Sequence, residues 1–150
     1  MTMIDIRYCI RWITSELKLL VAHLHEIGRV YPTMVAGIPV ASANANWTIG
    51  GLATVVAAGA IAGDYRLHAV SLEAADHDGV YELVIYQGAA DVEVCHVRFA
   101  VVGGFFGNSY YVLTGPLVPG GARLRAAVAC STGLAAIATV TISVAYHLVV

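Results

Sequence analysis

Charged side chains are scarce in this sequence. They make up 12% of its 150 residues, about half of the ~25% that is usual in soluble domains. Eight Lys and Arg face ten Asp and Glu, so the net charge is -2, and no basic run occurs. A nucleic-acid-binding surface needs a basic patch or stripe, so we expect no nucleic-acid partner. So little charge indicates instead that partner proteins cover much of the surface.

Recognisable catalytic and metal-binding motifs are also missing. No Ser lies in a Gly-x-Ser-x-Gly pattern, no phosphate-binding loop occurs, and the six His lack the spacing of a zinc site. Asp76, His77 and Asp78 crowd polar groups into one turn near Glu73. Adjacent residues of a tight turn point in different directions, however, and Asp-Gly is typical of hairpin turns. The sequence predicts no enzyme, no cofactor and no metal site.

Cysteine is rare and odd in number, at Cys9, Cys95 and Cys130. We predict buried free thiols in a reducing compartment, with a Cys95–Cys130 disulfide as the alternative. Arg7, Arg11 and Glu16 interrupt the first apolar stretch, so neither a signal peptide nor a membrane span is expected there. The uncharged stretch 34–63 contains Pro and Gly residues that disfavour a spanning helix. A membrane partner is not expected.

The most regular pattern is an apolar heptad repeat in the first 27 residues. Its a positions are Met3, Ile10, Leu17 and Leu24, and its d positions are Ile6, Ile13, Leu20 and Ile27. Such a seam predicts a helix that packs against copies of itself or, alternatively, against its own domain. Because the d layer is mostly Ile, a trimer is favoured over a dimer. A second stripe, with Tyr8, Trp12 and Leu19, predicts contact with another protein.

The predicted helix ends near residue 30. Gly28 supplies a C-terminal stop, Arg29 suits the negative helix end, and Pro32 prevents continuation. The following residues up to 46 are small, uncharged and broken by Gly37 and Pro39. We therefore predict three parts: a coiled-coil or bundle helix at 1–30, a linker or extended arm at 31–46, and a β-sandwich domain at 47–150.

From residue 47 onward the pattern is that of short β-strands separated by Gly, Asn and Asp. Strands are expected at 65–74, 80–87, 92–102, 109–117, 122–131 and 136–148, with one or two more between 47 and 61. In the last one, Val140, Ile142, Val144 and Tyr146 share one face, while Thr139, Thr141, Ser143 and Ala145 share the other. Seven to eight strands without intervening helices predict an antiparallel sandwich. A jelly roll is favoured over an immunoglobulin-like fold, since the Cys, Trp, Cys spacing of the latter is absent.

The stretch 103–111 (GGFFGNSYY) is the best candidate for a contact surface within this domain. Phe105 and Phe106 lie between glycines on a predicted loop, and exposed aromatic side chains are favoured anchors of interfaces. The alternative is that both rings cap the open end of the sandwich.

The C-terminal two thirds resembles the small jelly-roll virion structural proteins of tailed bacteriophages, of the decoration or fibre type. The resemblance covers about residues 44–148 and is carried by 46–50 (NWTIG), 81–89 (YELVIYQGA), 97–99 (VRF), 122–124 (ARL) and 145–147 (AYH). It implies a non-enzymatic component of the particle.

Together these observations predict a mainly β protein, a jelly-roll-like sandwich preceded by one long oligomerising helix. We expect a homotrimer located in the virion and assembled in the host cytoplasm, as a head decoration, head fibre or vertex or tail attachment protein. Its partners would be its own copies and another virion protein, such as the major capsid protein or a tail or portal component. The alternative is a carbohydrate- or receptor-binding module on a trimeric stalk, with Tyr86, Tyr110 or Tyr111 stacking on sugars. A membrane-associated assembly protein is a third interpretation.

Overall fold

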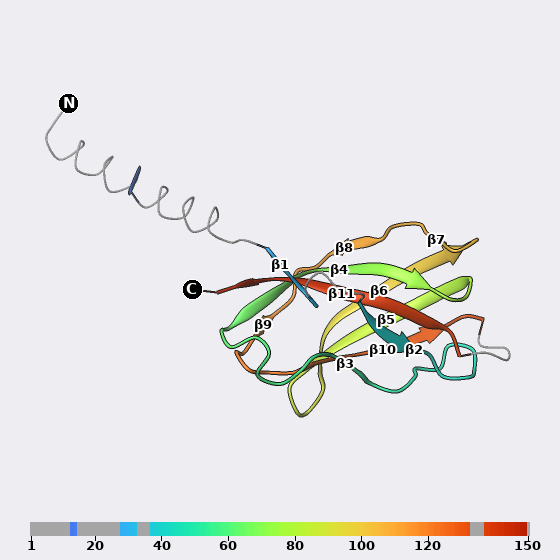
Figure 1. The fold of residues 1–150 in the computed structure, drawn as a ribbon, viewed down its shortest axis with the longest axis horizontal. Coiled ribbons are helices and arrows are strands. Elements are labelled where there is room, and N and C mark those ends of the chain that lie inside the picture. Colours follow the sequence, from blue (N-terminus) through green and yellow to red (C-terminus); the bar gives the residue numbers. More distant parts are fainter. Residues whose placement is uncertain (1–12, 15–27, 33–36, 133–136, 150) are drawn as a thin grey trace, which may run out of the picture.

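The computed structural model describes residues 13–14, 28–32, 37–132 and 137–149, whose eleven strands form two antiparallel sheets (Figure 1). The six-stranded sheet contains β1 (Arg29–Tyr31), β2 (Ile38–Ala41), β4 (Tyr65–Ala75), β8 (Tyr110–Val112), β9 (Leu117–Val118) and β11 (Thr139–Leu148). The five-stranded sheet contains β3 (Ala53–Val56), β5 (Gly79–Gln87), β6 (Val92–Val102), β7 (Phe105–Phe106) and β10 (Leu124–Cys130).

Long strands occupy the middle of each sheet. In the six-stranded sheet β11 and β4 pair from Val140↔Ala75 to Leu148↔Tyr65. In the five-stranded sheet β5 lies between β10 and β6, and β3 and β7 form the two edges. Both sheets contribute to one hydrophobic core, so they pack face to face as a sandwich. Two antiparallel sheets around one core agree with the predicted β domain.

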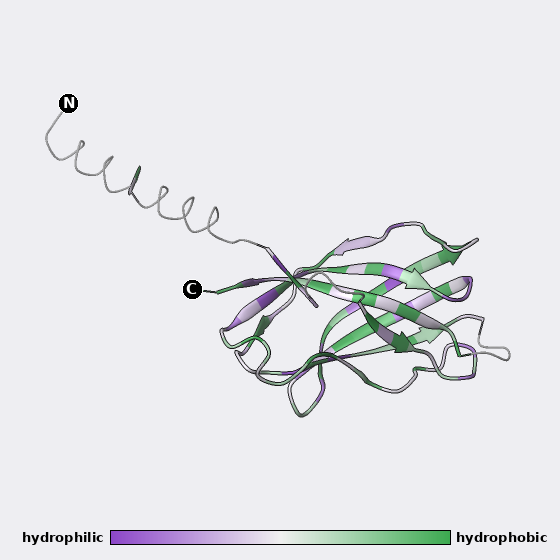
Figure 2. Ribbon diagram, in the orientation of Figure 1, coloured by the Kyte–Doolittle hydropathy of each residue, from purple (hydrophilic) through white to green (hydrophobic). Residues whose placement is uncertain are grey.

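Side chains alternate between the core and the outer faces as the period of two predicts. The core cluster includes Val140, Ile142, Val144 and Tyr146 of β11, Tyr81, Leu83 and Ile85 of β5, and Leu124, Ala126 and Val128 of β10. Their neighbours along each strand lie outside that cluster. The same alternation of hydrophobic and hydrophilic residues is visible along the long strands (Figure 2). The predicted face assignment of the last strand is confirmed, and β5 and β10 follow the same period of two.

The predicted fold class is wrong in its helical part, because every element in the part of the chain that the structure describes is a strand. The helix was predicted to reach residue 30, yet β1 begins at Arg29 and pairs with β11 as Arg29↔Tyr146 and Tyr31↔Val144. Gly28 and Arg29 were interpreted as helix-ending signals from their immediate neighbours alone, without knowledge of a pairing partner. The edge of β11 offers backbone hydrogen-bond partners to residues 29–31, which readily form strands. This tertiary pairing makes residues 29–31 a strand and not the end of a helix.

Most residues of the predicted seam and of the second stripe fall outside the described part of the chain. Ile13, the one seam residue inside it, has an exposed side chain. Outside it lie Met3, Ile6, Tyr8, Ile10, Trp12, Leu17, Leu19, Leu20, Leu24 and Ile27. Within the expected linker, residues 38–41 form β2, which pairs with β11 beside β1.

Two of the three cysteines lie in the described residues. Cys95 and Cys130 are free and buried, which confirms the prediction for this pair, while Cys9 lies outside the described part. Burial raises the pKa of the Cys95 thiol to about 11, and nearby Glu93 adds to the shift. Among the described residues, no helix has the length and apolar character needed to cross a membrane.

Candidate functional site

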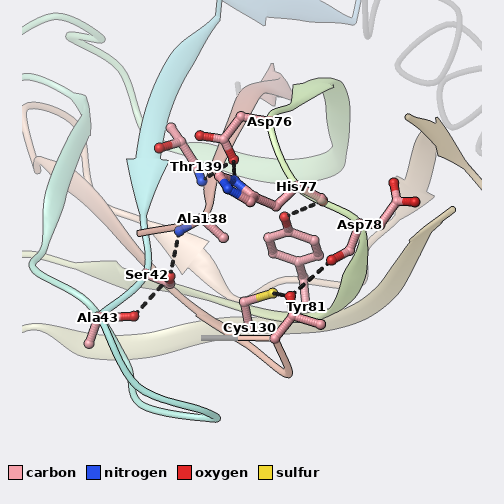
Figure 3. Close-up of polar contacts among 10 residues, drawn as sticks. Ser42, Ala43, Asp76, His77, Asp78, Tyr81, Cys130, Ala138 and Thr139 are labelled. Atoms are coloured by element: carbon pink, nitrogen blue, oxygen red, sulfur yellow. Dashed lines mark hydrogen bonds and ion pairs between the residues drawn. The ribbon is translucent and has the colours of Figure 1, made fainter. Parts of the chain in front are cut away.

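The turn between β4 and β5 carries the polar residues that the sequence singled out (Figure 3). The Asp76 carboxylate accepts a hydrogen bond from the Thr139 backbone N–H at 2.7 Å and pairs with His77 Nδ1 at 2.7 Å. Burial alone would raise the pKa of Asp76, but the hydrogen bonds from His77 and Thr139 outweigh it and hold the pKa below its usual value. Asp76 therefore ties the turn to the start of β11.

Asp78 and Glu73 also bind backbone donors. Asp78 accepts hydrogen bonds from the N–H groups of Gly103 and Gly104 at 2.7 and 3.0 Å, and these bonds lower its pKa. Glu73 accepts one from Gly37 N–H at 2.7 Å. No group of three or more His, Cys, Asp or Glu able to hold a metal occurs among the described residues. The three carboxylates join separate loops to one another.

Ser42 and the Asp76–His77 pair lie in the same region, but they do not form a hydrolytic arrangement. The buried Ser42 hydroxyl donates to the Ala43 carbonyl at 3.1 Å and accepts from Ala138 N–H at 3.0 Å (Figure 3). An activated nucleophile needs its hydroxyl directed at a general base. Here the proton is directed at a backbone carbonyl, so Ser42 fixes the entry to β11.

Tyr81 closes this end of the core. Its hydroxyl donates to the His77 carbonyl at 2.6 Å, and burial beside Cys130 raises its pKa above the ordinary value. We call Asp76, His77, Asp78 and Tyr81 the polar turn cluster. Its hydrogen bonds run mainly to backbone groups, which is what a structural cluster requires.

The two phenylalanines of the predicted contact loop point in different directions. They form β7, an edge strand that pairs with β6 as Val101↔Phe106 and Val102↔Phe105. Phe106 packs against Phe99, with ring centroids 6.1 Å apart, whereas the Phe105 side chain is 79% exposed. The Phe106 ring thus packs against the core, as the capping alternative predicted, whereas the Phe105 ring faces solvent and its role in a contact surface stays a prediction.

The edge strand β8 likewise has one ring that packs against the core and neighbours that face solvent. Tyr111 packs against Phe99 at 6.3 Å between ring centroids, while its neighbours in β8 are exposed. β7 ends the five-stranded sheet and β8 ends the main order of the six-stranded one. Phe106 of β7 and Tyr111 of β8 both pack against Phe99, so the two strands lie at the same side of the sandwich. We call the exposed apolar residues of this side, Val102, Phe105, Tyr110 and Val112, the edge group.

A pocket of about 360 Å³ lies on the outer face of the five-stranded sheet. We call it the Trp47 pocket, and it is lined by Trp47, Ile49, Glu82, Arg98 and Ala129. Ala129, Glu82 and Arg98 stand in one row across β10, β5 and β6, because Ala129 pairs with Glu82 and Glu82 with Arg98. Trp47 and Ile49 come from the segment between β2 and β3. The small Ala129 leaves space between these two walls.

Ion pairs fix the polar wall of the Trp47 pocket. Glu82 accepts hydrogen bonds from Arg98 at 2.7 Å and from His96 Nε2 at 2.5 Å, and His96 Nδ1 lies 3.4 Å from Glu93. The hydrogen bond from Arg98, followed by that from His96, lowers the pKa of Glu82. The Arg98 guanidinium also lies 4.9 Å from the centroid of the Trp47 ring.

Sequence reasoning did not find this pocket. Trp47 was noted as part of a motif, but its partners lie 35 and 51 positions further along, at Glu82 and Arg98. Cross-strand register brings them together, and register cannot be read without the pairing. The available signal was the opposite charge of Glu82 and Arg98 on predicted strands. Tyr86, Tyr110 and Tyr111, the tyrosines expected to stack on sugars, do not line this pocket.

Comparison with known proteins identifies no family for this chain. No protein-family model matches the chain, and no curated protein matches it. Among solved structures, the infectious bursal disease virus VP2 subviral particle is similar at a TM-score of 0.39 and 14% identity. The Gx strain of that virus has a TM-score of 0.34 and the Gt strain 0.33, each at 14% identity.

The aligned regions cover 81 to 82% of this chain. They cover 32 to 33% of the viral chains, so the chain spans about a third of their length. At these TM-scores the likeness assigns neither a fold family nor a function to the chain.

Proposed function

We propose that this chain is a non-enzymatic structural protein of a phage particle, as a head decoration, head fibre or vertex or tail attachment. It acts by associating with its own copies and by docking to another virion protein. The proposal takes its biological setting from the resemblance of residues 44–148 to small virion proteins. The edge group is the observation that carries the association.

The edge group is unusually apolar for solvent-exposed edge strands. Val102, Phe105 and Val112 are 73%, 79% and 70% exposed. Natural proteins guard such edges with charged residues, above all Lys, because free edges pair with other chains. No residue of β7 or β8 is charged, whereas the charged residues of β6, Glu93 and Arg98, precede its end at Val102. An unguarded apolar edge supports contact with a second copy of the chain.

The polar residues support a role without catalysis. The carboxylates of the polar turn cluster accept bonds from backbone N–H groups, and the Ser42 hydroxyl donates to a carbonyl. Their hydrogen-bonding capacity holds loops in place, which suits a component that must keep its shape inside an assembly.

Sedimentation velocity and native mass spectrometry of the full chain at micromolar concentration test the association. We expect a mass of several protomers for the natural sequence and a monomer for Phe105→Asp, since burying an unpaired charge opposes contact. Val92→Asp is the matched control, because Val92 is an exposed apolar residue of β6 outside the edge group. It should leave the mass unchanged.

Two results overturn the association through this edge. One is a natural chain that sediments only as a monomer, and the other is a Phe105→Asp variant that keeps the natural mass while its circular dichroism is unaltered. The virion role is tested separately, by mass spectrometry of purified particles from the source of this sequence. Absence of the chain from those particles rejects it, whatever its oligomeric state.

A further inference from the structure

We propose that the Trp47 pocket binds a neutral saccharide. This inference goes beyond the proposed structural role and does not depend on it, because the pocket and the edge group share no residue. It rests on a fixed aromatic platform, a pre-paired polar wall and a floor formed by a small side chain.

The platform is held rigidly. Trp47 has a φ of 53°, a left-handed conformation that is exceptional for a bulky residue and persists only where the surroundings impose it. Its N–H donates to the Cys130 carbonyl at 2.9 Å, and Gly50 N–H donates to the Val128 carbonyl at 3.0 Å. These bonds anchor the segment to β10 on both sides of Ile49. Trp47 is nevertheless 45% exposed, so the residue is accessible although its backbone is anchored.

Gly50 allows the segment to pass close to Ala41, the last residue of β2. A Cβ at this position would lie 2.0 Å from the Ala41 carbonyl oxygen, so a side chain there would push the segment away. The hydrogen bonds to the carbonyls of Cys130 and Val128 place Trp47 and Ile49 above β10. The apolar wall is thus positioned by backbone contacts and needs no ligand to form.

The floor of the pocket is formed by the small side chain of Ala129. This residue is buried, yet it lies outside the core cluster and so belongs to the outer face of β10. A longer side chain at 129 would occupy the space between Trp47 and the Glu82–Arg98 pair. The volume of about 360 Å³ lies within the roughly 300–1,000 Å³ range of ligand pockets.

The charges of the wall favour a neutral ligand. Both Glu82 oxygens already accept hydrogen bonds, from Arg98 and from His96. The negative charge of Glu82 is therefore already compensated and offers little attraction to a cationic ligand. Arg98 is likewise paired, and the carboxylate of Glu93 beyond His96 disfavours an anionic ligand. Arg98 has further N–H groups that can donate to the oxygens of a ligand. The His96 imidazole and the carboxylates of Glu82 and Glu93 can form hydrogen bonds with ligand hydroxyls.

A saccharide has the matching chemistry. Its ring presents C–H groups on one face, which suit the part of the indole that Arg98 leaves exposed, and hydroxyls around the rim, which suit Arg98 and Glu82. Hydrolysis of the sugar is disfavoured, because a general acid needs a raised pKa and that of Glu82 is lowered. The pocket is therefore suited to recognition.

The test uses the full chain on an array of neutral oligosaccharides ending in glucose, galactose, mannose or N-acetylglucosamine, with sialylated and sulfated counterparts. We expect at least one neutral glycan to bind. Trp47→Ala should weaken binding by about tenfold or more, as loss of an aromatic stacking platform does elsewhere. Trp47→Phe, which keeps a ring, should retain most of it.

Two further variants separate the pocket from the fold. Ala129→Leu fills the floor and should abolish binding, whereas Ala100→Leu, on the same outer face but outside the pocket, should leave it unchanged. The sequence has two Trp, so in a Trp12→Phe background the fluorescence of Trp47 reports binding directly, and a bound sugar should shift its emission.

The proposal is overturned if no neutral glycan binds, if only the sialylated or sulfated ones bind, or if Trp47→Ala and Ala129→Leu bind as the natural chain does. Melting temperatures of all variants establish that each one is folded. Should Trp47→Ala fail to fold, Ala129→Leu against Ala100→Leu decides the question alone.

Discussion

The polar turn cluster and the edge group both lie next to Phe99 and use their side chains in opposite ways. Phe99 stacks on Tyr81 of the cluster at 5.2 Å between centroids, and it also packs against Phe106 and Tyr111 next to the edge group. In the cluster, polar groups bind the backbone of neighbouring loops. In the edge group, apolar side chains remain in solvent. The first region closes the fold, and the second is where the fold can still be extended by another chain.

The largest effect is expected where the two regions meet. Phe99→Ala removes the ring that Tyr81, Phe106 and Tyr111 share, and substitutions of this kind lower the free energy of unfolding by about 3–5 kcal/mol. Urea denaturation followed by circular dichroism measures it. A loss below about 1 kcal/mol would mean that the two regions are not joined through this side chain.

A smaller and more selective effect separates the two faces of β7. Phe106→Ser should lower the free energy of unfolding by about 1–3 kcal/mol, because its ring packs on the core. Phe105→Ser should change it by less than about 0.5 kcal/mol, since that ring is exposed. Thermal unfolding of the two variants, each compared with the natural chain, makes the measurement. Equal losses would contradict the opposite orientation of the two rings.

The smallest effect concerns pH and the polar turn cluster. The folded-state pKa of Asp76 lies below its unfolded value, so its contribution to stability is present above about pH 4 and is lost as the pH falls through the folded pKa. Asp76→Asn keeps an oxygen for Thr139 N–H but does not titrate. Unfolding free energies from pH 7 to pH 3 should therefore fall less steeply in this variant. Parallel curves would show that Asp76 adds nothing to the acid sensitivity.

Some features of the β domain were predictable from local pattern. Alternation along residues 139–146 placed Val140, Ile142 and Val144 in the core correctly, because a strand between solvent and core must alternate. The turn glycines at 103 and 104, with φ of 60° and 79°, were likewise recognisable. The short strands β1, β2 and β7 were not predicted. Segments of two to four residues carry no periodic signal, and they become strands only because β11 and β6 offer them an edge.

The candidate site shows the same division. The sequence placed Phe105 and Phe106 together as one contact motif, and only the side-to-side alternation of an edge strand separated an exposed ring from a packed one. The Trp47 pocket had no continuous motif at all. Its two walls come from three strands and a loop, and cross-strand register sets which residues face each other.

By itself the sequence determined that this chain is mainly β, which residues of its long strands face the core, and that its cysteines at 95 and 130 are buried thiols. These features depend on local periodicity and on hydrophobicity, which a single segment carries alone. Only the tertiary structure decided that residues 29–31 form a strand, that Phe105 is exposed and that Trp47 meets Arg98. The first and the last depend on partners distant in the chain, residues 144–146 and Arg98, which are in place only once the sheets have formed. The exposure of Phe105 depends on which side of β7 packs against Phe99.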